Sequence, residues 1–187
     1  MLTREFFQTD PVTCARKLVG ATLVWGESRS LIAETEAYGA IGDEACHTWS
    51  RPSARAFVEN HPAGTAYVYF NYGMHWMLNV LVKGRKDGFV LFRALEPLSG
   101  LESMHLARGV KDPLQLCSGP GKLARALGVT GADHGRDLCH PDGPHMVAAE
   151  NKVSVVSAPR VGISRAQELP WRFCLKGCLH VSKPRPK

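Results

Sequence analysis

Between Tyr67 and Val82 the chain carries aromatic and aliphatic residues with few polar ones among them. Aromatic and β-branched residues favour strands, and Asn71 and Gly73 can supply the positive φ angles of a tight turn. The segment therefore predicts two β-strands joined at Asn71-Tyr72-Gly73. Tyr72 then lies at the tip of a protruding hairpin, where it has little core to pack against. A large ring there has the shape of a wedge, and stacked bases are a surface that protein wedges enter.

Two other interpretations of this hairpin stay open at this point. Residues 60–82 contain no Lys, Arg, Asp or Glu, so the segment also has the hydropathy of a membrane span. The turn at its middle and the polar Asn and His residues inside the window argue against a span. The second alternative is an ordinary buried hairpin whose tip tyrosine folds back onto the core.

Helix signals lie on both sides of the hairpin. Thr9-Asp10-Pro11 has the chemistry of an N-cap and first turn, which predicts a short helix that ends near Gly20. Ser99-Gly-Leu-Glu102 has the spacing of a capping box, and the helix behind it is expected to run to about Gly109. A third short helix is expected over residues 123–127.

The remaining apolar runs predict strands over residues 21–25, 31–38, 89–95, 153–156, 160–163 and 172–175, with an irregular loop over 130–150. Pro97 is expected to stop the strand that begins at residue 89. Because strands and helices do not alternate, the predicted fold class is α+β. We expect a single compact domain over residues 1–182, with a mainly antiparallel curved sheet, flanking helices and the protruding hairpin. Residues 183–187 are expected to form a frayed basic tail.

Composition narrows the class of protein. The 187 residues are 44% hydrophobic and 21% charged, which is ordinary for a globular chain. Arg4, Glu5 and Asp10 interrupt the N-terminal segment, which therefore does not resemble a signal peptide, and an intracellular protein is expected. The net charge of +6 and the pI near 9.1 lie at the threshold that is typical of nucleic-acid binding.

Cysteine spacing gives little support to a metal site. Six cysteines are scattered along the chain, and Cys174-x-x-x-Cys178 with His180 only weakly matches a zinc pattern. Structural thiols in a reducing compartment are the better interpretation. We expect no metal and no cofactor.

Two carboxylates lie on one face of a predicted strand. In Leu31–Tyr38 the side chains alternate between faces, so Glu34 and Glu36 are neighbours roughly 7 Å apart. Partial burial would raise the pKa of at least one of them, as a general base requires. The alternative is an edge strand with a solvated acidic face.

Arg93 interrupts the apolar run of residues 89–95, and a buried guanidinium needs a carboxylate partner. Glu36 or Glu34 can supply it, either in a site or in a purely structural ion pair. His47 fits a hydrogen-bonding role in a pocket better than a metal site. Tyr67 and Tyr69 share a strand face, so one of them can stack on a flat ligand, although such faces also form cores.

Several short motifs of one known protein family occur in the same order, and with similar spacing, between about Leu2 and Ser182. They are Glu34-Thr-Glu-Ala-Tyr38, Asp43-Glu-Ala-Cys-His47, Tyr67-Val-Tyr-Phe-Asn-Tyr-Gly-Met-His75 with Asn79, Arg93-Ala-Leu-Glu-Pro97, Ser118-Gly-Pro-Gly-Lys122, Arg160-Val-Gly-Ile163 and Pro170-Trp-Arg-Phe173. In these residues the chain resembles the alkyladenine (3-methyladenine) DNA glycosylase family.

The resemblance implies a base-excision-repair enzyme that flips a damaged purine out of duplex DNA and hydrolyses its N-glycosidic bond, leaving an abasic site. The implied substrates are 3-methyladenine, 7-methylguanine, hypoxanthine and ethenoadenine. By position, the resemblance implies that Glu36 activates the attacking water and that Arg93 orients its carboxylate. It implies that Tyr38, His47 and Tyr69 bind the flipped base and that Asn79 excludes guanine. Tyr72, with Met74, would fill the gap left in the stack of bases.

Further expectations follow from the same resemblance. No Lys falls at a motif position suited to a Schiff base, so a monofunctional glycosylase without lyase activity is expected. The partner is double-stranded DNA that contains damaged purines, and the protein is expected to act as a monomer, away from membranes, wherever the cell keeps its DNA (cytoplasm and nucleoid, or nucleus).

The segment after His47 departs from the family pattern of Thr-Pro-Arg-Asn followed by Met-Phe. The matching positions here are Ala56 for the Asn and Glu59-Asn60 for Met-Phe, while Arg51, Ser53 and Arg55 can still contact phosphates. The departure leaves the packing of this loop and the substrate range open.

Two other functions compete with this one. A catalytically inactive damaged-DNA-binding protein would keep Tyr72 and the basic surface without using Glu36. A carbohydrate hydrolase would use Glu34 and Glu36 as an acid–base pair, but neighbours on one strand face do not flank a sugar bond from opposite sides.

Overall fold

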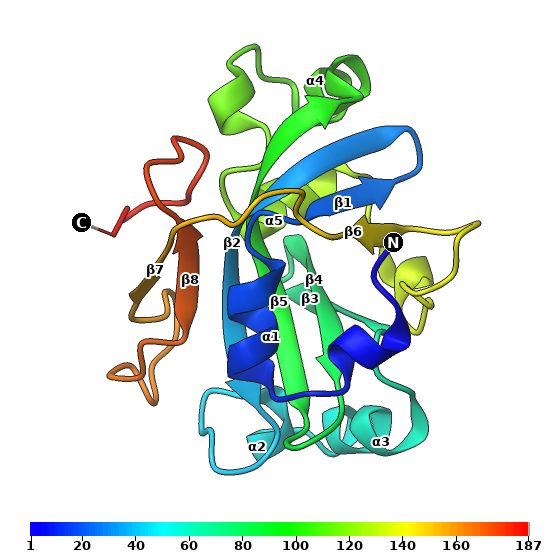
Figure 1. Ribbon diagram of the computed structural model, residues 1–187, viewed down its shortest axis with the longest axis vertical. Coiled ribbons are helices and arrows are strands. Elements are labelled where there is room, and N and C mark those ends of the chain that lie inside the picture. Colours follow the sequence, from blue (N-terminus) through cyan, green and yellow to red (C-terminus); the bar gives the residue numbers. More distant parts are fainter. Residues whose placement is uncertain (187) are drawn as a thin grey trace.

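Two long strands, β2 (Ser28–Gly39) and β5 (Gly88–Ser99), pair along most of their length at the centre of the structure. The computed structural model describes residues 1–186. Among these residues, eight strands form one open antiparallel sheet in the order β3-β4-β5-β2-β1-β6, and β8 pairs with both β2 and β7 (Figure 1). The predicted α+β class is therefore confirmed.

The other strands are β1 (Thr22–Trp25), β3 (Ala66–Asn71), β4 (His75–Val82), β6 (His145–Val147), β7 (Val155–Ala158) and β8 (Arg172–Leu175). The α-helices are α1 (Pro11–Leu18), α2 (His47–Ser50), α3 (Pro52–Asn60), α4 (Leu101–Arg108) and α5 (Pro120–Ala126), with 3-10 turns at Arg4–Phe7, Pro113–Gln115 and Gly131–Asp133. Within residues 1–186, every helix is too short or too polar to cross a membrane.

Helix α1 lies across one face of the sheet over β2 and β5 (Figure 1). It begins where the sequence predicts, because the Asp10 side chain accepts a hydrogen bond of 2.9 Å from the Thr13 N–H. Cys14 and Leu18, on the inner face of α1, are fully buried, as is Phe92 of β5. The main core therefore lies between α1 and the sheet.

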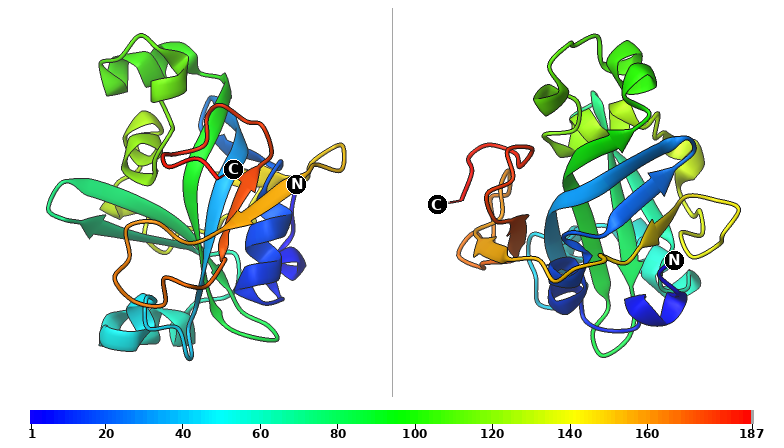
Figure 2. Two further views of the ribbon diagram at one scale, coloured as in Figure 1. Left: turned by 90° about the vertical axis from the view of Figure 1, so that its left-hand side faces the viewer. Right: turned by 45° about the horizontal axis from the view of Figure 1, so that its top comes forward.

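The strands β3 and β4 form the predicted hairpin, which projects from the sheet (Figure 2). A second, smaller core lies at its base, where Phe57 of α3 contacts Tyr67 of β3 and Phe89 of β5. The Tyr67 and Phe89 rings stack with centroids 4.4 Å apart. This cluster fixes α2 and α3, which the sequence pattern did not predict, against the hairpin.

Two predictions fail around the end of β5. Pro97 does not stop the strand, which continues to Ser99, because Pro97 pairs with Ser30 next to a bulge, where a missing N–H is tolerated. The capping box is also wrong. The N-cap of α4 is Gly100 in the left-handed conformation (φ 75°), and the hydroxyl of Ser99 donates to the Glu27 carbonyl instead.

Other corrections concern the second half of the chain. Residues 160–163 form a loop and not a strand. The Val161 N–H donates to the Glu36 side chain, and the Arg160 side chain donates to Asp43, so these residues make side-chain contacts in place of a backbone ladder. The strand expected at 153–156 lies at Val155–Ala158. The region 130–150 is mostly irregular as predicted, but His145–Val147 pairs with β1.

The C-terminal residues are less detached than expected. Lys183, Pro184 and Arg185 are exposed, yet the Pro184 carbonyl accepts a hydrogen bond of 2.9 Å from Arg172. Lys187, the last residue of the predicted tail, lies outside the described residues. The boundary after residue 182 stays a prediction.

A buried ion pair joins the loop after β2 to the loop between β7 and β8. Arg160 Nη1 and Nη2 donate to the two carboxylate oxygens of Asp43 at 2.6 and 2.8 Å, and both side chains are fully buried. The guanidinium also lies 4.7 Å from the Tyr38 ring and 5.3 Å from the Trp171 ring. The two loops are thereby held at a fixed separation beside the end of β2.

We expect Asp43→Asn to destabilise the fold by about 3–5 kcal/mol, because it leaves the buried Arg160 charge without its partner. Urea denaturation measures this loss. The matched control is Glu44→Gln, whose partner Arg165 and own carboxylate are both about half exposed. That change is expected to cost less than about 1 kcal/mol. Equal losses of stability in the two variants would show that the buried Asp43–Arg160 ion pair has no special weight in the fold.

Candidate active site

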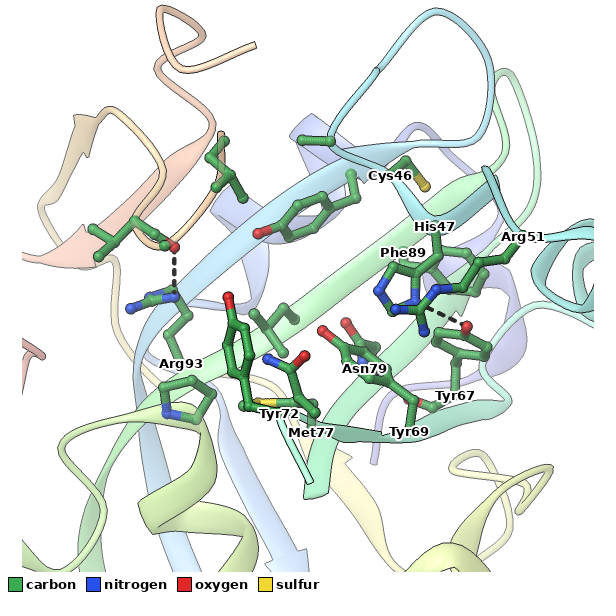
Figure 3. Close-up of a pocket in the computed structure, with 18 residues that line it drawn as sticks. Cys46, His47, Arg51, Tyr67, Tyr69, Tyr72, Met77, Asn79, Phe89 and Arg93 are labelled. Carbon is green, nitrogen blue, oxygen red and sulfur yellow. Dashed lines mark hydrogen bonds between the residues drawn. The ribbon is translucent and has the colours of Figure 1, made fainter. Parts of the chain in front are cut away.

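A cavity of about 460 Å³ opens between the hairpin, the end of β2 and the loops after β2 and β7. Its volume falls in the range of small-molecule sites, which commonly hold about 300–1,000 Å³. Figure 3 shows Arg93 on one side of it, His47, Arg51 and Tyr67 on the other, and Asn79 between them. Aromatic rings and a few polar groups therefore enclose a space suited to a flat molecule.

Glu36 lies behind the wall of this cavity, fully buried in β2. Its Oε2 accepts hydrogen bonds from the Tyr38 hydroxyl at 2.7 Å and from Arg93 Nη1 at 3.3 Å. Its Oε1 accepts one from the Val161 N–H at 2.8 Å. All three donors belong to residues that line the cavity. The carboxylate is thus held in one orientation next to the space that a ligand would fill.

Opposing effects act on the pKa of Glu36. Burial raises the pKa above its ordinary value of 4.5, and the Arg93 charge, the Val161 N–H and the Tyr38 hydroxyl pull it down, with burial prevailing. The alternative of a solvated acidic edge is wrong, because β2 pairs with β5 on one side and with β1 and β8 on the other. Glu36 therefore has the environment of a general base.

Arg93 contacts both carboxylates that the sequence offered as partners. Its Nε donates to Glu34 Oε1 at 3.0 Å and its Nη1 reaches Glu36 at 3.3 Å, so one guanidinium bridges the pair. Glu34 is fully buried and does not line the cavity. It also accepts a hydrogen bond of 2.6 Å from Arg172 Nε. The two carboxylates consequently do not flank a substrate, which argues against a sugar hydrolase.

His47 lies at the start of α2, with its Nδ1 3.0 Å from the Tyr67 hydroxyl and its ring 4.2 Å from the Tyr69 ring. Burial, together with the nearby Arg51 charge, lowers the pKa of His47 to about 4. The imidazole is therefore neutral near pH 7 and can donate one hydrogen bond and accept another.

The two tyrosines of β3 have different surroundings. Tyr67 belongs mainly to the small core, whereas Tyr69 is half-buried and faces the cavity. Burial raises the pKa of Tyr67 to about 12, and burial also raises that of Tyr69, so both hydroxyls keep their protons. Asn79 on β4 is buried, and its amide donates to the Tyr67 carbonyl at 3.0 Å. The Asn79 side chain is thereby fixed at the cavity wall.

The hairpin tip is exposed, as the wedge interpretation requires. Tyr72 is 79% exposed and Met74 is 68% exposed, so the tip tyrosine does not fold back onto the core. The Met74 N–H donates to the Asn71 carbonyl, with positive φ at both Tyr72 (51°) and Gly73 (65°), as a type I′ turn requires. The sequence pattern predicted positive φ angles at Asn71 and Gly73. In the structure Tyr72, and not Asn71, has the positive φ angle beside Gly73.

The three expected phosphate contacts lie around the start of α3. Arg51 precedes the helix and lines the cavity, with its guanidinium 5.8 Å from the Tyr69 ring. Ser53 is exposed, and Arg55 is exposed with Nη1 donating to the Thr48 carbonyl. Of the three, Arg51 alone lines the cavity, and Ser53 and Arg55 lie on the exposed first turns of α3. Their contact with phosphate stays a prediction.

The departures in this segment do not disturb its packing. Ala56, Glu59 and Asn60 are exposed on α3, and the buried positions are Ala54, Phe57 and Val58.

Four further residues belong to the site or support it: Val161, Arg160, Arg172 and Ser182. The first three lie in motifs of the family resemblance to which the sequence assigned no role, and Ser182 lies in none of those motifs. The sequence could have indicated that Arg172 is buried. It begins the apolar run Arg172–Leu175, just as Arg93 lies within the apolar run of residues 89–95. Within residues 1–186, no group of three His, Cys, Asp or Glu side chains is arranged to hold a metal ion.

Comparison with known proteins agrees with this geometry. The family model described as Methylpurine-DNA glycosylase (MPG) matches residues 5–179. A protein of Rhodopseudomonas palustris (strain ATCC BAA-98 / CGA009) is 44% identical over the whole chain and 90% of its own length. One from Nitrosospira multiformis is 42% identical over 95% of this chain and 92% of its own. Both carry the name "Putative 3-methyladenine DNA glycosylase".

A protein of Agrobacterium fabrum with the same name is 41% identical over 96% of this chain and 91% of its own length. The family model covers most of the chain, and the relatives match it nearly from end to end. The chain therefore belongs to the methylpurine-DNA glycosylase family of DNA-repair enzymes.

Proposed function

We propose that this DNA glycosylase flips alkylated or deaminated purines into the cavity beside Glu36 and hydrolyses their N-glycosidic bond. The substrates would be 3-methyladenine, 7-methylguanine, hypoxanthine and ethenoadenine in duplex DNA, and the product an abasic site. One observation carries the proposal: a buried, hydrogen-bonded carboxylate lies against an aromatic cavity whose rim bears an exposed tyrosine.

Glu36 is the general base of this proposal. In the hydrolysis it accepts a proton from a water molecule, whose oxygen forms a bond to the anomeric carbon while the C–N bond breaks and its electron pair passes to the departing purine. A cationic methylpurine thereby leaves as a neutral base, whereas a neutral purine such as hypoxanthine must also take up a proton as it leaves. The raised pKa of Glu36 favours the proton transfer from water. Arg93 keeps the carboxylate directed toward the cavity, and its charge favours the ionised form of Glu36.

The cavity wall suits an electron-poor purine. Methylated purines such as 3-methyladenine carry positive charge, and aromatic faces attract cations. Tyr38, Tyr69 and a neutral His47 would surround the flipped base without adding a positive charge. Asn79, fixed by its bond to the Tyr67 carbonyl, would crowd the exocyclic amino group of guanine, and the positive charge of 7-methylguanine, which keeps that group, would have to offset this penalty. Selectivity then rests on charge and on shape.

The hairpin tip would hold the duplex open. A flipped nucleotide leaves a gap in the stack, and insertion of an apolar or aromatic side chain offsets part of the unstacking cost of a few kcal/mol. Tyr72 and Met74 are exposed on a two-stranded projection, and Tyr72 also lines the cavity mouth. Arg51, Ser53 and Arg55 would contact the phosphates on the other rim.

The product would be an intact strand with an abasic site. β-Lyase glycosylases form a Schiff base through an amine, and no lysine of residues 1–186 lines the cavity. We therefore propose a monofunctional enzyme that acts as a monomer on double-stranded DNA. An inactive binder is less well supported, because it has no use for a buried Glu36 held by three hydrogen bonds.

We expect Glu36→Gln to lower single-turnover release of hypoxanthine or 7-methylguanine by at least about 100-fold, the lower range for loss of a general base. Binding of lesion DNA, measured by fluorescence anisotropy, is expected to persist. Glu44→Gln, an exposed carboxylate near the site, is the matched control and keeps full activity. Unchanged release by Glu36→Gln would rule out the base assignment.

The pH profile of 7-methylguanine release should show an acid limb. Only ionised Glu36 accepts a proton, so release falls as pH drops through its pKa, and burial places that limb above the ordinary 4.5. A cationic leaving base needs no acid catalyst, so no second group has to be protonated. Rates are measured in single turnover, with Glu36→Gln as the blank for spontaneous depurination. A flat profile down to pH 4.5 would contradict the prediction.

Tyr72→Ala is expected to weaken binding to lesion DNA by about tenfold or more and binding to undamaged DNA by less than about twofold, because the ring acts only where a base has left the stack. Phe70→Ala, which removes a half-exposed ring from the same hairpin, is the control. Titration of matched duplexes measures both constants. Equal weakening on the two duplexes would show that Tyr72 has no role specific to lesions.

A further inference from the structure

The segment that follows Cys178 packs beside β8, where it contacts side chains of β8 and β2 (Figure 2). Ser182, near its end, is buried, and its N–H and hydroxyl make three hydrogen bonds with Glu34 and Arg93. Its N–H donates to Glu34 Oε2 at 2.6 Å and its hydroxyl donates to Glu34 Oε1 at 2.9 Å. The same hydroxyl oxygen accepts from Arg93 Nη2 at 3.3 Å. A residue late in the chain thus contacts the pair that adjoins Glu36.

Arg172 fastens this segment from the other side. Its Nε donates to Glu34 Oε1 at 2.6 Å, and its Nη2 donates to the carbonyls of Ser182 and Pro184 at 3.0 and 2.9 Å. The guanidinium is almost fully buried. Glu34 therefore accepts hydrogen bonds from three residues (Arg93, Arg172 and Ser182) and lines no part of the cavity. Its role is to hold other groups in place.

Each nitrogen of the Arg93 guanidinium has a side-chain partner, and Nη1 also lies 3.5 Å from the Val161 carbonyl. Nε bonds to Glu34, Nη1 to Glu36 and Nη2 to the Ser182 hydroxyl. A planar guanidinium with a bond in each of three directions cannot rotate away from any one acceptor without stretching the others. Only the Nη1 bond reaches the carboxylate beside the cavity. The other two set the direction in which Nη1 points.

We propose that Ser182 is a positioning residue for catalysis: its hydroxyl bridges Glu34 and Arg93 and so directs the Arg93 guanidinium onto Glu36. The inference rests on the proposed role of Glu36. The hydroxyl can be removed while the Ser182 N–H and Arg172 continue to fasten the segment to Glu34. The effect on Arg93 is therefore separable from the effect on the fold.

The charge environment of Glu36 makes this role measurable. The titratable and charged groups that act on it are Glu34 and Tyr38 of β2, Arg93 of β5, Tyr69 of β3, Arg160 of the loop before β8, and Cys174 of β8. Among them, Arg93 is the largest influence that lowers the pKa of Glu36. If Arg93 is less well directed, the pKa of Glu36 rises and the acid limb of the rate profile moves to higher pH.

The test compares Ser182→Ala, Ser182→Thr and Ser30→Ala in the full chain. Ser182→Ala should lower the single-turnover rate constant for 7-methylguanine release about tenfold, the size of effect that a hydrogen bond to a charged group has on an equilibrium. Its acid limb should move to higher pH, with lesion-DNA binding within twofold of wild type. Ser182→Thr keeps the hydroxyl and should restore both the rate and the profile.

Ser30→Ala is the matched control, a buried serine on β2 whose hydroxyl has no hydrogen-bond partner within residues 1–186. It should leave the rate and the profile unchanged. A wild-type rate and profile in Ser182→Ala, alongside an inactive Glu36→Gln, would overturn this inference alone. A slower Ser182→Ala with an unmoved acid limb, or without rescue by Thr, would make Ser182 merely structural. Undiminished release by Glu36→Gln would overturn the proposed function, and this inference with it.

Discussion

The burial of two carboxylates around one guanidinium constrains the rest of this structure. Ions removed from water are stable only when charge and hydrogen bonds replace their hydration. Arg93 meets Glu34 and Glu36, and Arg172 supplies the second positive charge, so the four groups balance. Strands β2, β5 and β8 must therefore lie side by side, which is how the sheet is ordered. The position of the site follows from this requirement of charge balance.

The sequence predicted the parts of the site that local patterns record. Arg93 within an apolar run required a carboxylate, and alternation along β2 put Glu34 and Glu36 on one face. The hairpin was predictable because strand residues flank a short turn, and its exposed tip is confirmed. Each of these inferences needed only neighbours in sequence and one rule about burial.

Contacts across long stretches of the chain could not be predicted in this way. Val161 bonds to Glu36 and Arg160 to Asp43 from a loop whose residues resembled a strand. No local pattern indicates that such a loop will reach the end of β2. The capping box at Ser99 failed for a related reason, since strand pairing extended β5 through that residue and Gly100 became the N-cap. Tertiary pairing prevailed over a local helix signal.

The left-handed backbone at Tyr72 limits which residues this position can hold. A positive φ costs an ordinary L-residue about 1 kcal/mol or more, and glycine or asparagine would relieve that cost. Neither of them carries an aromatic ring. A relaxed turn and an exposed ring are therefore mutually exclusive at residue 72, and random substitution that stabilises the free protein would tend to remove the ring. The stability of the free protein therefore does not account for a tyrosine at residue 72.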